Sequence, residues 1–155
     1  MLVIDTNVIS EVMKLRMDDH VLDWFHDNSG ELYLTSLTVM ELNYGIMRLP
    51  KGKRRDALRK HLDSIMRDCK DRILDFDSFS GYVCADLRCK AQAIGYTPQI
   101  ADCMIAAICM RNNATLVTHN VKDFDYIDDL EIVDPFAYES PVLAKLKRRE
   151  AERGE

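Results

Sequence analysis

Short apolar runs alternate with helical patterns along most of the chain, and this alternation constrains the fold more than any other feature. Strands joined through helices run parallel, and helices cover a parallel sheet on both faces. The pattern therefore predicts an α/β fold with three layers (α/β/α) and a mainly parallel central sheet. We expect strands at residues 2–4, 32–35, 73–76, 115–118 and 130–133, and helices at 8–13, 18–25, 37–48, 51–69, 78–94 and 99–111.

Residues that favour the first and last helical turns predict the helix boundaries. Ser36 is expected to be the N-cap of the helix 37–48, and Gly95 is expected to end the fifth helix. Thr97 is expected to cap the sixth helix, with Pro98 in its first turn. These boundaries place the polar residues that follow each strand at one edge of the sheet, where ligands of parallel α/β proteins bind.

Composition predicts one domain, residues 1–137, followed by a polar C-terminal tail, residues 138–155, because 155 residues with 47% hydrophobic side chains suit a single core. No apolar run is long enough for a signal peptide or a membrane span, so we expect a soluble, cytoplasmic protein. The five cysteines include no C-x-x-C pair, which argues against a disulfide framework and structural zinc. A net charge of −5 argues against a protein that coats nucleic acid, but it does not exclude a nuclease with an acidic metal site.

Three acidic residues stand where packing alone would not place them. Asp5 directly follows the first strand, and Asp102 lies early in an otherwise apolar helix. Glu41 lies within an apolar stripe of the helix 37–48, and a carboxylate buried there must be paired, protonated or bound to a metal. Each acid alone has a structural explanation, such as a helix cap or a distant salt bridge. The stripe consists of Leu37, Met40, Tyr44 and Met47.

All three acids are expected to converge at the same edge of the sheet, because each lies at a strand end or in the first half of a helix that follows a strand. Carboxylate clusters of this kind bind Mg²⁺ or Mn²⁺, which prefer oxygen ligands and retain several waters. Such ions activate water and stabilise the attacking and leaving oxygens of a phosphodiester. The residues therefore favour metal-assisted phosphodiester hydrolysis.

Four segments share a recognisable combination of residues with one family. They read Leu-Val-Ile-Asp-Thr-Asn-Val-Ile at 2–9, Thr-Val-Met-Glu-Leu-Asn-Tyr-Gly at 38–45, Ile-Ala-Asp-Cys-Met-Ile-Ala-Ala at 100–107 and Leu-Val-Thr-His-Asn-Val-Lys-Asp-Phe at 116–124. In this order they closely resemble the PIN-domain ribonuclease toxins, the VapC family and its FitB-like relatives. The resemblance covers residues 1–137 and implies a PIN-like fold and a Mg²⁺- or Mn²⁺-dependent endoribonuclease.

The resemblance also assigns residues to the site. By position, Asp5, Glu41 and Asp102 match the three metal-binding, catalytic acids of the family. The family commonly places a fourth acid in the block after Thr118, and Asp123 is favoured for it here. Asn120 occupies the place that some relatives fill with Asp, and it is the alternative, holding a metal-bound water.

Two threonines and a histidine complete the residues singled out by the resemblance. Thr6 and Thr118 would orient the carboxylates through hydrogen bonds, as groups behind metal ligands do. A capping or strand-end hydroxyl explains both threonines as well. His119 stands where the family commonly has Arg, which is a departure at a position for substrate contact.

Family membership would further imply partners. A homodimer is expected, together with a cognate antitoxin whose C-terminal segment blocks the active site of a type II toxin–antitoxin pair. The antitoxin would also bind operator DNA, so DNA would be reached only through it. The alternative function is a catalytically weak PIN-fold partner that acts mainly in such a DNA-binding repressor complex.

Other interpretations explain the pattern less completely. A phosphatase of the haloacid-dehalogenase type needs a second Asp two positions after the first, where Asn7 stands. A receiver domain needs a phosphorylatable Asp on a middle strand, and Asp75 is a poor candidate. The basic segment 51–55, with further Lys and Arg behind it, is either a solvated helix face or a patch that tracks phosphates beside the acids.

Overall fold

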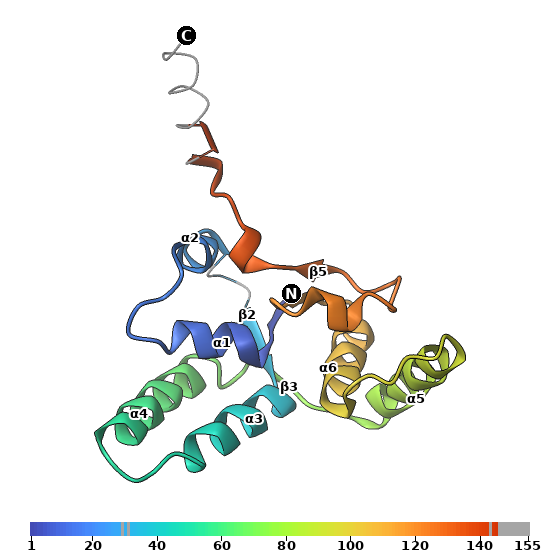
Figure 1. The fold of residues 1–155 in the computed structure, drawn as a ribbon, viewed down its shortest axis with the longest axis horizontal. Helices are drawn as coiled ribbons and strands as arrows, with labels where there is room; N and C mark the ends of the chain where they lie inside the picture. The colour runs from blue at the N-terminus through green and yellow to red at the C-terminus, as the bar shows by residue number, and fades with distance from the viewer. Residues whose placement is uncertain (29, 31, 143, 146–155) are drawn as a thin grey trace.

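A computed structural model describes residues 1–28, 30, 32–142 and 144–145. Within these residues, five strands form one sheet in the order β3-β2-β1-β4-β5, and every neighbouring pair is parallel. The α/β/α prediction is therefore confirmed, with a sheet that is wholly parallel instead of mainly so (Figure 1). The strands are β1 Leu2–Ile4, β2 Leu32–Thr35, β3 Ile73–Leu74, β4 Thr115–Val117 and β5 Ile132–Val133.

The described residues also form six α-helices and two short 3-10 helices, all but the last of which lie between strands. They are α1 Thr6–Val12, α2 Asp19–Asn28, α3 Ser36–Met47, α4 Lys53–Asp68, α5 Ser78–Ala93, α6 Ile100–Arg111, η1 Val121–Phe124 and η2 Pro135–Ala137. Parallel strands need crossover connections, and helices supply most of them here. Thr118 and Phe76 lie outside the strands that the sequence predicted to include them.

Alternating residues of the central strands build two cores, one on each face of the sheet. Val3 and Leu116 point into a core shared with α5 and α6. Their neighbours Ile4 and Val117 point into a second core with α1, α2, α3 and α4. Because successive strand residues face opposite sides, this arrangement buries β1 and β4 on both faces. Figure 1 shows the two groups of helices on either side of the sheet.

Two predicted helix caps are wrong, one by one residue and the other by two. Thr35, not Ser36, caps α3, because its hydroxyl accepts a hydrogen bond from the Thr38 backbone N–H at 3.0 Å. Gln99, not Thr97, precedes the first residue of α6 and makes no side-chain cap bond. Thr35 wins over Ser36 because the strand ends there in the extended conformation that an N-cap needs.

The end of α5 follows its prediction. Gly95 adopts a φ of 75°, and the Tyr96 backbone N–H donates to the Ala91 carbonyl oxygen at 2.9 Å. This pattern satisfies carbonyls at the end of the helix, and glycine adopts the left-handed conformation without a Cβ penalty.

No described helix is long and apolar enough to cross a membrane. The boundary between residues 137 and 138 stays a prediction. Much of the predicted tail, residues 143 and 146–155, lies outside the described residues.

Candidate active site

Asp5 combines a structural role with a position at the edge of the sheet. Its backbone N–H donates to the Val117 carbonyl oxygen at 2.9 Å, which continues the pairing of β1 with β4 by one residue. Its carboxylate accepts from the Thr6 backbone N–H at 2.7 Å and so caps α1. Only 5% of Asp5 is exposed, so the carboxylate is held in a fixed place at the carboxyl end of β1.

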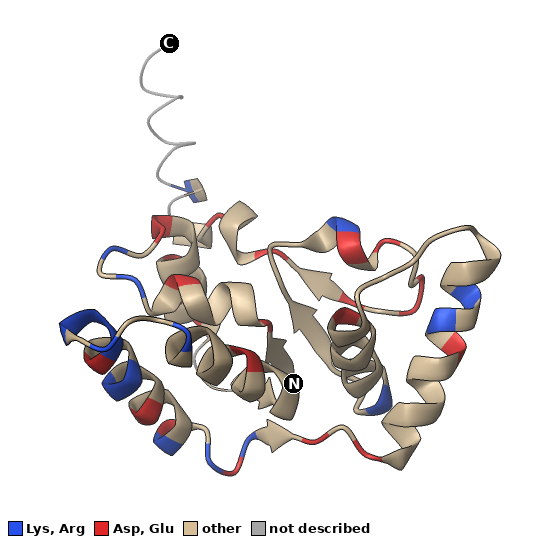
Figure 2. Ribbon diagram, turned by 60° about the horizontal axis from the view of Figure 1, so that its bottom comes forward, with Lys and Arg blue, Asp and Glu red and all other residues tan. Residues whose placement is uncertain are grey.

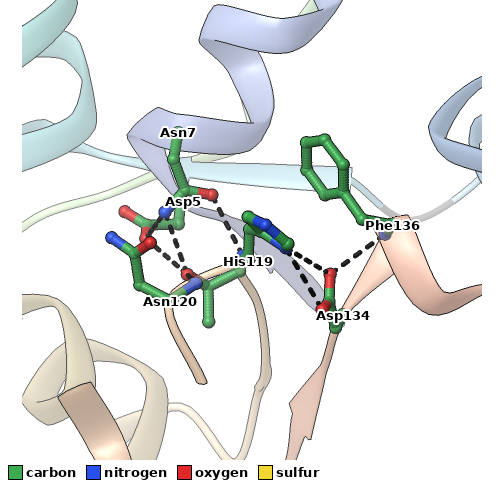
Figure 3. Close-up of polar contacts among 7 residues, drawn as sticks. Asp5, Asn7, His119, Asn120, Asp134 and Phe136 are labelled. Carbon is green, nitrogen blue, oxygen red and sulfur yellow. Dashed lines mark hydrogen bonds and ion pairs between the residues drawn. The ribbon is translucent and has the colours of Figure 1, made fainter. Parts of the chain in front are cut away.

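A network of short polar side chains fixes the second oxygen of that carboxylate (Figure 3). The Thr118 hydroxyl and the Asn7 amide donate to Asp5 Oδ2 at 2.7 and 2.6 Å. Asn7 Nδ2 also lies 3.0 Å from Thr118 Oγ1, which accepts from the Asn120 backbone N–H at 3.1 Å. The His119 backbone N–H donates to Asn7 Oδ1 at 3.1 Å, so the network joins the segments after β1 and β4.

Glu41 and Asp102 approach from the two helices that flank Asp5. Glu41 lies in the middle of α3, where its Oε2 accepts a hydrogen bond from the Thr6 hydroxyl. Asp102 lies in the first turn of α6, where the helix dipole favours a negative charge. Both side chains are half-buried.

The expectation of a buried apolar stripe around Glu41 is wrong. Met40, Tyr44 and Met47 are exposed by 50%, 60% and 61%. The side of α3 that faces the core carries Thr38, Leu42 and Ile46. Glu41 therefore lies at the border between the core and an exposed apolar surface, with access to solvent.

Three of the four predicted acids border one cleft of about 380 Å³. Asp123, the fourth, does not line the cleft, although its charge acts on Asp102. Thr118 lies fully buried beneath Asp5. The lining residues are Asp5, Thr6, Asn7, Glu41, Tyr44, Asp102 and Asn120.

Electrostatics show that these carboxylates interact. Burial raises the pKa of Asp5, and the Glu41 charge adds to this, while hydrogen bonds from Thr118 and Thr6 oppose it. The pKa of Asp102 rises from 3.8 to about 6, first through burial and then through the charges of Asp5, Asp123 and Glu41. Like charges at a partly desolvated site raise one another's pKa values, and a bound divalent cation would relieve that repulsion.

The oxygen atoms that line the cleft suit a hard cation as ligands, although they do not enclose one. No three His, Cys, Asp or Glu side chains among the described residues are arranged as a ready-made metal-binding group. Mg²⁺ is commonly held by one or two carboxylates and retains several waters, so it does not need a complete set of protein ligands. Carboxylate, amide and hydroxyl oxygens line this cleft, and these are the ligand types that Mg²⁺ and Mn²⁺ prefer.

A larger groove of about 1090 Å³ adjoins the cleft and shares Thr6 and Glu41 with it. Its walls come from α1, α3 and α4 and are mainly apolar, with basic side chains of α4 among them. Figure 2 shows Lys and Arg gathered along α4, interspersed with acids. Lys53 and Arg54 of the basic segment therefore border the groove, while Arg59 donates to Asn43 Oδ1 at 2.5 Å and ties α4 to α3.

Sequence reasoning missed two residues of the cleft and one pair beside it. From the sequence, Asn7 was considered only as the position where a phosphatase would need a second Asp. Its place two residues after Asp5 was nevertheless a usable signal, because a short polar side chain there can form a hydrogen bond back to the capping residue. Tyr44 was assigned to the core. His119 Nδ1 lies 3.2 Å from both carboxylate oxygens of Asp134, a pairing that no local pattern predicts (Figure 3).

Comparison with known proteins extends the likeness to most of the chain. Residues 2–130 match the PIN domain family. The chain is 35% identical to "VapC ribonuclease Y4jK" of Sinorhizobium fredii over 88% of this chain and 98% of that protein. It is 32% identical to "Toxin FitB" of Neisseria gonorrhoeae over 88% of this chain and 99% of that protein. The structure of FitAB bound to the IR36 DNA fragment superposes with a TM-score of 0.81 at 30% identity, covering 90% of this chain and 98% of that one.

Proposed function

Because this chain belongs to the PIN-domain family, we propose that it is the toxin of a type II toxin–antitoxin pair and a Mg²⁺- or Mn²⁺-dependent endoribonuclease. The observation that carries the proposal is the cleft in which Asp5, Glu41 and Asp102 meet, with Asp5 held by three side-chain and backbone donors. The family names of the relatives, a ribonuclease and a toxin, point to RNA as the substrate.

Each residue has a task in this proposal. Asp5, Glu41 and Asp102 supply the oxygen ligands of the cation, and Asp123 adds negative charge from outside the cleft. When bound, the cation supplies an activated water and stabilises charge on the phosphodiester. Thr118 and Asn7 hold Asp5 Oδ2, and the Thr6 backbone N–H holds Oδ1. The Thr6 hydroxyl orients Glu41 in the same way. Asn120 lines the cleft, and in this proposal its side chain would hold a water of the cation's shell.

The partners in this proposal are an antitoxin and, through it, operator DNA. A chain of FitAB, in a structure of FitAB bound to the IR36 DNA fragment, superposes on this chain with a TM-score of 0.81. An antitoxin segment laid over the cleft would exclude RNA while the complex occupies its operator. The same observation favours a second candidate function, a catalytically weak partner that acts mainly in a DNA-binding repressor complex. We further propose that the toxin works in the cytoplasm as a homodimer.

Growth inhibition distinguishes the two functions. Expression of the toxin without its antitoxin should arrest growth, and Asp5→Asn should abolish the arrest while leaving the fold intact, because Asn keeps the size of Asp5 but not its charge. The matched control is Asp63→Asn, which changes an exposed carboxylate of α4 that does not line the cleft. An Asp5→Asn protein that is expressed, folded and still toxic would remove Asp5 from the mechanism.

A further inference from the structure

Tyr44 is the aromatic side chain that lines the acidic cleft. It lies on α3 three residues after Glu41, so the two side chains project from the same side of the helix. Its ring is 60% exposed instead of packed in either core. A large apolar ring is thus open to solvent beside the carboxylates.

Arg48 adds a positive charge to this ring. Its guanidinium carbon lies 5.4 Å from the centre of the Tyr44 ring, which is within the range of a cation–π contact. Arg48 forms no ion pair with any carboxylate in the part of the chain that the structure describes. The residue itself is exposed, so its charge remains available beside a cleft lined by acids.

We propose that Tyr44 and Arg48 form a subsite for an unpaired nucleotide next to the cleaved phosphodiester, with Tyr44 stacking on the base and Arg48 contacting a phosphate. This inference rests on the proposed ribonuclease function and names the part of the RNA that binds beside the acids. Stacking on an aromatic ring tolerates any base, but it needs a base that is not already stacked in a duplex. The subsite therefore selects single-stranded RNA.

The charge of the cleft explains why such a subsite is needed. Asp5, Glu41 and Asp102 repel the phosphates of RNA, and the cation offsets that repulsion only locally. Affinity for the neighbouring nucleotide must come from groups outside the carboxylates. Among the described residues that line the cleft, Tyr44 is the only aromatic side chain, and the guanidinium group of Arg48 contacts its ring.

A second copy of the chain is the competing occupant of this surface. Met40 and Met47 lie on the same side of α3 and are exposed by 50% and 61%. If this face were covered in a homodimer, Tyr44 would support subunit contact instead of RNA binding. The test must therefore measure oligomeric state as well as RNA affinity.

The experiment measures binding of a short, fluorescein-labelled single-stranded RNA of mixed sequence by fluorescence anisotropy in Mg²⁺. All proteins carry Asp102→Asn so that the probe stays intact. Adding Tyr44→Ala should weaken binding about 5- to 150-fold, the factor that corresponds to one lost stacking contact. Tyr44→Phe should restore the affinity, since it keeps the ring, and Arg48→Gln should lower the salt dependence by about one phosphate contact. Tyr82→Ala is the matched control, an exposed tyrosine on α5 outside the lining of the cleft.

Several results would overturn the inference. They are a parent protein that binds no RNA, a Tyr44→Ala protein that binds like its parent, and a Tyr44→Phe protein that is as weak as Tyr44→Ala. A change in mass by light scattering that accompanies the loss of affinity would assign Tyr44 to a subunit contact. RNA bound through Tyr44 but never cleaved by the protein with Asp102 intact would contradict only the proposed nuclease. If cleavage depends on Asp102 but Tyr44→Ala has the same KM as the wild type, only the subsite would be contradicted.

Discussion

Asp102 should destabilise the metal-free protein at neutral pH. Its pKa is raised from 3.8 to about 6 by burial and by the charges of Asp5, Asp123 and Glu41. Between these two values the folded protein binds a proton that the unfolded chain has lost, so the free energy of unfolding falls as pH rises through this window. Below about pH 4 Asp102 is protonated in both states and the penalty is absent, whereas above about pH 6 it is complete.

The size of this penalty follows from the shift. A shift of about two units is worth about 3 kcal/mol at 1.36 kcal/mol per unit. Asp102 is only half-buried, and solvent screens the charges around it, so we discount the penalty to about 1–2 kcal/mol. Asp102→Asn removes the charge at nearly constant shape and should raise the free energy of unfolding by about that amount at pH 7.5, which corresponds to roughly 2–8 °C in Tm for a chain of this length.

Urea unfolding of wild type and Asp102→Asn, in EDTA at pH 4 and pH 7.5, measures the effect. The gain in Asp102→Asn should be present at pH 7.5 and nearly absent at pH 4. Asp86→Asn, an exposed acid of α5 paired with Lys90, is the control and should not gain stability at pH 7.5. A gain of equal size at both pH values, or no gain at either, would refute the account of mutually repelling carboxylates.

Two further predictions concern single hydrogen bonds and backbone conformation. Thr118→Val should lower the free energy of unfolding by about 1.5–3 kcal/mol at pH 7.5, because it removes the hydroxyl donor to the Asp5 carboxylate. Thr115→Val, at the first residue of β4, removes only an exposed hydrogen bond to Glu131 and should cost less than about 1 kcal/mol in the same urea titration. Gly95→Ala should destabilise by about 1 kcal/mol or more because φ is 75° there, while Gly81→Ala inside α5, where a Cβ meets nothing within 4 Å, should stabilise by about 0.5–1 kcal/mol. Equal effects of the two alanine variants on Tm would contradict this use of the backbone angles.

Local signals allowed the sequence to predict where β1 ends and with it the position of Asp5. The apolar run before Asp5 and the Asp-Thr-Asn that follows it specify a strand, a cap and a helix within a few residues. Asp102 was predictable for the same reason, since an acid in the first turn of an apolar helix is visible without any tertiary contact. The parallel order of the strands followed from the helices between them.

Contacts between distant segments were beyond such reasoning. Asn7 bonds to Thr118 across 111 positions of sequence, so its place in the network depends on the pairing of β1 with β4. Apolar periodicity on α3 also gave a wrong prediction of the buried face, because Met40 and Tyr44 have the spacing of core residues but lie on the exposed side. Spacing shows that residues share a face of a helix, and only the packing of neighbouring elements decides which face is buried.

The most direct test of the central claim is cleavage of total cellular RNA by the purified, antitoxin-free protein. We predict discrete fragments with Mg²⁺ or Mn²⁺, none with EDTA, and none from Asp102→Asn with either metal. Fragments that persist in EDTA or in a folded Asp102→Asn protein would contradict the metal-dependent carboxylate site. Intact RNA under every condition, from a folded protein that still takes up metal, would contradict the nuclease and favour the repressor-partner function.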